Sequence, residues 1–323
     1  MIKKFLKANL SCIVIILIGL FLTYYRLPYY ILAPGGTIDI SNRVTVDKKP
    51  SKINGSLNLL YATQYQANIP MYLLSYIIDT LDREKVSDEQ VGDETVKEIE
   101  LRNKYLLDNS INNALYVAYH ESNIDLTIKS SKVIVLAASK DNPNKFRVGD
   151  VILSIDEKKI NNVSDIKNIE NPNNEYKFIV ERDNQEITIN ASKDKEGKYG
   201  IVLTTNYEYN LPDDIEIKFK KSESGPSGGL MLSLSIYSAL NNEDLIKGKK
   251  IAGTGTISLD GTVGEIGGVK YKLIGAARNK VDIMLVPEEN YDECLNLKEK
   301  YKYDIEVVKV HTFTDAINYL RSL

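Results

Sequence analysis

A serine within a glycine-rich turn is the first feature of this 323-residue chain that could do chemistry. Ser227 stands directly before the apolar segment 230–240, in the run Gly225-Pro226-Ser227-Gly228-Gly229. That segment is long and apolar enough for a helix buried on most sides. Backbone N–H groups and the positive dipole at the start of a helix can stabilise an oxyanion, and glycines let a substrate approach closely. We therefore predict that Ser227 is a nucleophile, although such a run also fits a simple turn before a helix.

The base for such a serine must come from the few candidates that the chain offers. The chain has two histidines, His120 and His311, and neither lies in a glycine-rich context. A serine–lysine pair is a known variant of the serine–histidine–aspartate arrangement. Two lysines stand in the triplet Lys270-Tyr271-Lys272, which follows a glycine pair and leads into a helical run at 273–277. One of these lysines is the expected base.

Helical geometry chooses between the two lysines. Lys270 and Lys272 are about 200° apart around a helix, so only one of them can face the serine. Lys272 shares its face with two small residues, Gly275 and Ala276. Small neighbours permit close packing, and burial lowers the pKa of a lysine toward neutrality, as a general base requires. Lys272 is therefore the predicted base, and Lys270 the predicted solvated partner.

Three ordered blocks of the sequence resemble the proteolytic domain of the Lon-type serine peptidases. They span residues 225–230, 251–257 and 261–272, and residues 286–290 are also similar to that family. The resemblance implies that Ser227 is the nucleophile, that Lys272 is the general base and that Thr254 hydrogen-bonds the dyad. It implies supporting positions in the serine turn at Gly225, Pro226 and Gly228.

Two positions of the serine turn depart from the family pattern. Gly228 stands where many relatives have alanine, and Ser224 stands where the ATP-dependent members have aspartate. The overall layout resembles the small membrane-anchored bacterial members, which carry a PDZ domain and no ATPase. The nucleotide-binding run G-x-x-x-x-G-K-[ST] does not occur in the sequence. We therefore expect ATP-independent cleavage of peptides or of segments that are already extended.

Composition excludes several other function classes. The 41 lysines and arginines against 44 aspartates and glutamates give a net charge of −3, and no basic stripe appears, so we expect no nucleic-acid binding. Neither histidine has a second histidine or a cysteine at ligand spacing, so we expect no metal and no cofactor. Cys12 lies in an apolar run and Cys294 is far from it in the sequence, so we expect no intrachain disulfide.

The N-terminus has the pattern of a membrane anchor. Lys3, Lys4 and Lys7 precede the uncharged, Ile- and Leu-rich stretch 8–25, whose length as a helix is about 27 Å. Basic residues before the span predict a cytoplasmic N-terminus, and tyrosines after it suit the membrane interface. We expect residues 1–26 to be a single-pass anchor in the cell membrane, with the rest of the chain extracytoplasmic. The alternative is a cleaved signal peptide.

The patterns after the anchor predict three further parts. Residues 27–110 are expected as an N-terminal segment, with strands at 37–46 and 57–62 and a helix near the membrane at 69–81. The charged stretch 82–102 reads as a solvated helix or linker without chemistry, and a helix is expected at 109–118.

Residues 111–206 resemble a PDZ domain. Strand-like runs occur at 132–137, 151–155, 176–182 and 186–191, with a Gly149-Asp150 turn before the second run and a short helix at 163–169. A PDZ domain binds extended peptides by strand addition. The family's carboxylate-binding loop is not obvious in residues 122–131, so docking and gating roles both stay open, as does a simple spacer.

Residues 207–323 are expected to form the proteolytic domain. Strands are predicted at 215–219, 249–253 and 283–287, helices at 288–301 and 314–323, and a hairpin turn at Asp260-Gly261. Strands and helices do not alternate as in a βαβ repeat, so the predicted class is α+β with several domains.

The sequence thus predicts an ATP-independent, membrane-anchored serine endopeptidase that acts on secreted peptides or on extended segments of surface proteins. Self-cleavage and a homo-oligomer are compatible with it. One alternative is a membrane-tethered PDZ protein that binds peptides and has an inactive protease domain. Another is a phosphotransferase, because some small-molecule kinases also have a Gly- and Ser-rich loop before a helix, although that class does not explain the segment around Lys272.

Overall fold

The computed structural model describes residues 9–50, 52–89, 94–139, 144–167, 169–218 and 225–323. Three lysines of the predicted anchor, the last residue of the strand predicted at 215–219 and Ser224 lie outside the described residues; the lysines are Lys3, Lys4 and Lys7. The predicted α+β class is confirmed: two large sheets are each combined with helices.

The main sheet joins strands from both ends of the chain. Its six strands follow the order β17-β16-β13-β4-β1-β5, and their bounds are β1 Arg26–Asp39, β4 Ser56–Asn68, β5 Asp82–Lys85, β13 Lys250–Gly253, β16 Ile283–Pro287 and β17 Glu306–Val310. Strand β13 pairs in parallel with β4 on one side and with β16 on the other. Strands that we expected in two separate parts, 27–110 and 207–323, therefore share one sheet. Periodicity cannot reveal such a pairing, because it reports which faces are buried and not which distant strand lies alongside.

Helices cover both faces of this sheet. Consecutive residues of β4, β13 and β16 are buried, and successive side chains of a strand point to opposite faces. Leu59, Ile251 and Leu285 face one core, which is completed by α7 (Gly229–Asn241), α10 (Phe313–Ser322) and α5 (Val96–Glu121). Leu60 and Ala252, one residue later on their strands, face a second core with α8 (Val269–Arg278) and α9 (Glu288–Tyr301). The serine turn and the lysine helix thus approach the sheet from opposite faces.

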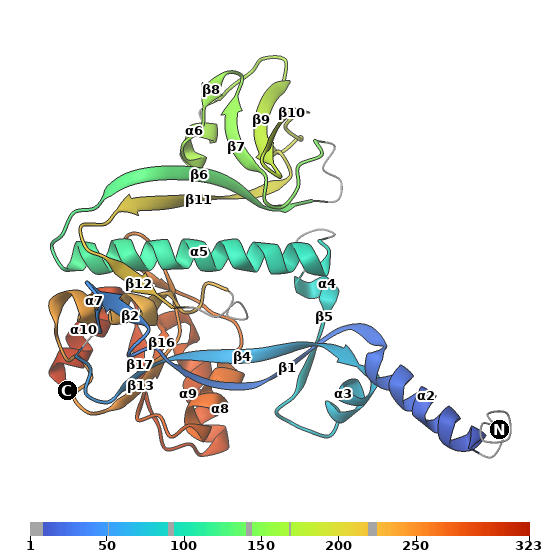
Figure 1. Cartoon of the computed structure of the whole chain (residues 1–323), viewed down its shortest axis with the longest axis vertical. Coiled ribbons are helices and arrows are strands. Elements are labelled where there is room, and N and C mark those ends of the chain that lie inside the picture. The colour runs from blue at the N-terminus through green and yellow to red at the C-terminus, as the bar shows by residue number, and fades with distance from the viewer. Residues whose placement is uncertain (1–8, 51, 90–93, 140–143, 168, 219–224) are drawn as a thin grey trace.

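Helix α5 is longer than the sequence predicts and separates the two sheets. It begins at a capping box, in which the Thr95 hydroxyl accepts from the N–H of Glu98 and the Glu98 carboxylate accepts from the N–H of Thr95. The charged stretch 82–102 therefore contributes β5, α4 (Val86–Glu89) and the first turns of α5. Figure 1 shows α5 lying between the main sheet and the β-rich unit.

The β-rich unit is inserted between α5 and the serine turn. Its strands follow the order β10-β9-β7-β6-β11, with β6 Thr127–Ala138, β7 Val151–Ile155, β9 Tyr176–Arg182, β10 Gln185–Ala191 and β11 Ile201–Asn210. Strand β8 (Lys158–Lys159) pairs with β7, and α6 (Val163–Lys167) is its short helix. Strand β11 crosses the predicted boundary between residues 206 and 207. The edge-to-face rings of Phe146, Phe178 and Tyr199, with centroids 5.0 Å apart in each contact with Phe178, fill its core.

The Gly149-Asp150 turn holds this unit together. Gly149 has a φ of +92°, which favours glycine, and its N–H donates to the carbonyl of Val135 over 2.8 Å. The buried Asp150 carboxylate accepts two hydrogen bonds of 2.7 Å from the guanidinium of Arg182. A charge buried in this way requires such a partner.

Small elements complete the fold. Strands β2 (Val44–Val46), β3 (Lys49–Pro50) and β12 (Ile215–Ile217) form a three-stranded sheet, and β14 (Thr256–Ile257) and β15 (Val263–Gly264) form the hairpin that the sequence predicts. The expected helix at 69–81 is confined to α3 (Ile69–Leu74), followed by turns.

Helix α2 (Leu10–Tyr24) is the described part of the predicted anchor. It has 15 residues, and within the ranges that the structure describes no helix has the length and apolar character that crossing a membrane requires.

Candidate active site

Ser227 lies in a turn, two residues before α7 begins. Gly225 has a φ of +90°, and Gly228 is the N-cap residue of the helix. A β-carbon on Gly229 would lie 2.6 Å from Cγ2 of Ile257, so the helix start fits against the hairpin only without a side chain. A β-carbon on Gly228 would meet Cδ2 of Leu59 at 3.1 Å, so an alanine requires only that this flexible side chain shift slightly. The predicted nucleophile is thus half-buried at the positive end of a buried helix.

Two residues of α5 hold the serine turn, and the sequence analysis missed both. The hydroxyl of Ser110 donates to the carbonyl of Pro226 over 3.1 Å, and the carbonyl of Asn103 accepts from the N–H of Gly225 over 3.2 Å. Ser110 is 6% exposed. A polar residue within the apolar face of a helix was its only signal in the sequence, and that signal does not name a partner.

Lys272 and Ser227 meet at the hydroxyl of Thr254. The ammonium nitrogen of Lys272 donates to Oγ1 of Thr254 over 3.0 Å, and this hydroxyl donates to the backbone carbonyl of Ser227 over 3.1 Å. The N–H of Gly255 donates to the same carbonyl over 2.8 Å. The structure therefore brings together the three residues that the family resemblance selected.

The amine of Lys272 is buried, and burial lowers its pKa to about 8. The side chain is buried because α8 packs closely on β1. A β-carbon on Gly275 would lie 3.2 Å from the backbone of Gly36, at a point where the register of β1 against β4 shifts between Pro34 and Thr37. The run Pro34-Gly35-Gly36 is typical of a turn, but these residues lie within β1. The irregularity in this strand makes room for the helix that carries the lysine.

Lys270 has a different partner. Its amine pairs with the carboxylate of Asp82 and donates to the carbonyl of Asp79 over 2.9 Å. The hydroxyl of Tyr271 also donates to Asp82, over 2.6 Å. Burial acts to raise the pKa of Asp82, but the hydrogen bonds and positive charge of Lys270, together with Tyr271, lower it overall. The charged stretch to which we assigned no chemistry therefore supplies the carboxylate that fixes the start of α8.

The histidines have other neighbours, and His311 pairs with Glu288 over 3.0 Å at the surface. His120 stacks on Tyr116 with centroids 6.0 Å apart. In the described ranges, no three His, Cys, Asp or Glu side chains gather as a metal site would need.

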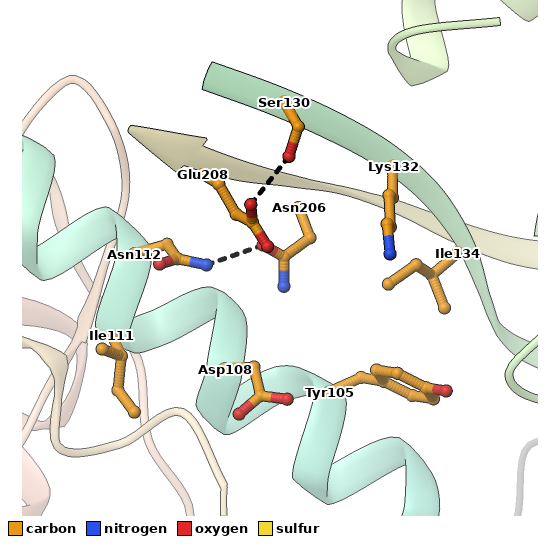
Figure 2. Close-up of a pocket in the computed structure, with 9 residues that line it drawn as sticks. All are labelled: Tyr105, Asp108, Ile111, Asn112, Ser130, Lys132, Ile134, Asn206 and Glu208. Carbon is orange, nitrogen blue, oxygen red and sulfur yellow. Dashed lines mark hydrogen bonds between the residues drawn. The ribbon is translucent and has the colours of Figure 1, made fainter. Parts of the chain in front are cut away.

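A polar cavity of about 330 Å³ lies on the other side of α5, between this helix and strands β6 and β11. Figure 2 shows Lys132 and Asp108 pointing into it from opposite walls. The amide of Asn112 donates to Asn206 over 2.7 Å, and that of Asn109 donates to Thr204 over 3.1 Å. Helix α5 thus contacts the β-rich unit through polar groups on one face and the serine turn through Ser110 on another.

Comparison with known proteins assigns the C-terminal part of the chain. Residues 212–321 match the model of the Lon protease (S16) C-terminal proteolytic domain. The Lon protease of Neorickettsia sennetsu is 34% identical over 98 residues, which is 30% of this chain and 12% of that protein. The Lon protease of Campylobacter jejuni is 31% identical over 123 residues, 38% of this chain and 15% of that protein.

These alignments cover only a small part of the curated relatives. The chain therefore contains a Lon-type proteolytic domain, whose family comprises serine peptidases with a Ser–Lys dyad. The resemblance inferred from the three sequence blocks is confirmed for this domain. Strands β1 and β4 and helix α5 lie outside the matched residues, yet they form part of the same sheet and core.

The hydroxyl of Thr254 can be tested apart from its methyl group. We expect Thr254→Val to lower kcat/KM for peptide cleavage by about 100-fold, because both the lysine and the serine carbonyl lose their shared partner and the dyad is misplaced. Thr254→Ser keeps the hydroxyl and should remain within a few-fold of the unchanged chain. Equal activity of the valine and serine variants would show that the hydroxyl does not position the dyad.

The burial of Lys272 should reduce the stability of the chain. Its pKa falls from 10.5 to about 8 on folding, and this difference lowers the free energy of unfolding at pH 7 by about 3 kcal/mol. Because the unfolded chain binds the proton more tightly, stability is lost as the pH falls from 10.5 to about 8. Lys272→Met removes this cost and one hydrogen bond of about 1 kcal/mol, so we expect a net gain of about 2 kcal/mol at pH 7.

Chemical unfolding at pH 7 and pH 10.5 measures this difference. The gain from Lys272→Met should shrink at the higher pH, where the amine is neutral in the folded chain and only about half protonated in the unfolded chain. A lysine variant at the exposed position Lys300 on α9, Lys300→Met, is the control and should show no such pH dependence. A gain that is equal at both pH values would contradict the assignment.

Proposed function

We propose that this protein is a membrane-anchored serine endopeptidase that cleaves peptides or extended segments of proteins through a Ser227–Lys272 dyad, without ATP. The observation that carries the proposal is the buried amine of Lys272, whose pKa is lowered to about 8 and which shares the Thr254 hydroxyl with the carbonyl of Ser227. A lysine held in this way is neutral in a usable fraction near neutral pH, as a general base must be.

The reaction that we propose has two stages. The neutral amine of Lys272 takes the proton of the Ser227 hydroxyl while Oγ bonds to the scissile carbonyl carbon, and N–H groups near the start of α7 stabilise the oxyanion. The lysine then gives its proton to the leaving amine as the C–N bond breaks. In the second stage, Lys272 takes a proton from water, whose oxygen attacks the acyl-enzyme, and returns that proton to Ser227.

The β-rich unit is proposed to be a PDZ-like module that docks substrates or gates the site. Support comes from its small sheet with one short helix and from the Gly149-Asp150 turn. Helix α5 would transmit an effect of docking, since it contacts the unit at Asn109 and Asn112 and the serine turn at Ser110. Peptide binding that moved α5 would thereby move the carbonyl of Pro226.

Membrane attachment through α2 completes the proposal. The helix exposes large apolar side chains along its length, and none of its residues is buried. Three lysines precede it in the sequence, which favours a cytoplasmic N-terminus and an extracytoplasmic catalytic part. Secreted peptides and surface proteins are the substrates that such a location would offer.

Cleavage by the full chain in detergent tests the dyad. We expect the unchanged chain to cut an unstructured protein in the absence of ATP, and Ser227→Ala to lose this activity. Lys272→Arg should lose it as well, because arginine keeps a charge that it cannot give up near neutral pH. Lys300→Ala, at an exposed position, should remain active. If all four folded chains fail to cut a broad panel of peptides, the peptide-binding protein with an inactive protease domain is the better interpretation.

The pH profile tests the identity of the base. Only the neutral amine of Lys272 accepts a proton, so kcat/KM should rise about tenfold per pH unit below pH 8 and level off above it. The measurement is kcat/KM between pH 6 and pH 10 for one fluorogenic peptide. A profile that already levels off near pH 6.5, where histidine titrates, would contradict the role of Lys272.

A further inference from the structure

The segment that includes α3 and its following turn exposes a group of large apolar side chains. Ile77 is 79% exposed, and the other members are between 40% and 62% exposed; together we call Leu73, Leu74, Tyr76, Ile77 and Ile78 the apolar tip. Contiguous apolar patches of this kind on a protein surface mark contacts with another protein or with a membrane.

The apolar tip has a fixed shape. The buried hydroxyl of Ser75 donates to the carbonyl of Tyr72 over 2.7 Å and accepts from the guanidinium of Arg83 over 3.1 Å. This guanidinium lies 3.7 Å from the centre of the Tyr76 ring, and the hydroxyls of Tyr72 and Tyr76 are 3.1 Å apart. The apolar side chains therefore point outward from a turn that hydrogen bonds and ring contacts hold.

The apolar tip is attached to the end of α2. The amide of Asn68 donates to the carbonyl of Thr23, near the end of α2, over 3.2 Å. The carbonyl oxygen of the same side chain accepts from the N–H of Met71 and so caps α3. Helices α2 and α3 contact each other, and Figure 1 shows α3 beside the C-terminal end of α2. The apolar tip therefore lies near the end of α2, whose apolar side chains are also exposed.

The distribution of apolar residues on α2 favours lipid over a second protein chain. Five consecutive residues, 14–18, are large, apolar and exposed, and five residues at about 100° each go fully round a helix. One flat partner surface would cover one side of such a helix, whereas lipid covers every side. Tyrosines at the end of α2, Tyr24 and Tyr25, and the arginines Arg26 and Arg83 are the residue types that membrane interfaces favour.

We propose that the apolar tip is a second membrane contact, which inserts into the same leaflet at which α2 ends. This inference rests on the membrane attachment in the proposed function and adds that two points, rather than one, fix the orientation of the proteolytic domain. Strand β4 runs from Asn68, beside the tip, to Leu59, beside Gly228. The nine residue steps from Leu59 to Asn68 span about 30 Å of extended strand, so the serine turn would act on substrate segments about 30 Å from the lipid.

Tryptophan fluorescence can test the contact directly, because the chain contains no tryptophan. The full-length chain is reconstituted into vesicles of phosphatidylcholine and phosphatidylglycerol, with and without brominated acyl chains, as three single-tryptophan variants. Ile77→Trp reports on the apolar tip and Phe21→Trp on α2. Val202→Trp is the matched control, since Val202 is 47% exposed on β11, which lies on the other side of α5 from α3 in Figure 1.

We expect the emission of both Phe21→Trp and Ile77→Trp to shift to the blue and to be quenched by brominated lipid, while Val202→Trp is unchanged. Quenching of Phe21→Trp alone would overturn the inference and leave the membrane attachment intact. Quenching of neither would overturn both. A blue shift of Ile77→Trp that depends on protein concentration and is insensitive to bromine would show that a second copy covers the tip, which also overturns the inference.

Discussion

The hydroxyl of Thr254 is the point on which the rest of the site depends. It accepts from the amine of Lys272 on one face of the main sheet and donates to the carbonyl of Ser227 on the other. Thr254 is fully buried at the end of β13, and its N–H donates to Leu285 on the neighbouring strand over 3.2 Å. A hydroxyl can both donate and accept, so one side chain can join an amine and a carbonyl that two different helices bring to the sheet.

Holding an amine in this place requires close backbone packing. Gly275 lies against Gly36 on β1, and Gly255 fits beside Val263 and Leu230, where a β-carbon would approach within 2.7 Å of Cγ1 of Val263. This packing excludes water from Lys272, and the same exclusion that lowers its pKa makes the folded state less stable. Lys270 shows the contrast within one helix turn, because its amine has a carboxylate partner at the surface.

The N-terminal region and the proteolytic domain are one structural unit with the β-rich unit inserted into it. Strands β1 and β4 complete the sheet, and α5 packs on α7 while it supports the serine turn. Sequence comparison alone matches residues 212–321, so it identifies the chemistry but leaves out half of the sheet. The arrangement places α5 in contact with both the inserted unit and the turn, which is the path that the proposed gating would use.

The sequence by itself determined the local elements and the chemical residues. Short strand-like runs located β7, β9 and β16, a long apolar run located α7, and the ordered blocks selected Ser227, Thr254 and Lys272. These features depend on neighbours within a few positions, and a linear pattern records such neighbours. Tertiary structure decided that β4 pairs with β13, that Ser110 and Asn103 hold the serine turn, and that Asp82 binds Lys270. Those contacts join residues far apart in the chain, and their partners are set by how helices and sheets pack, which no local pattern records.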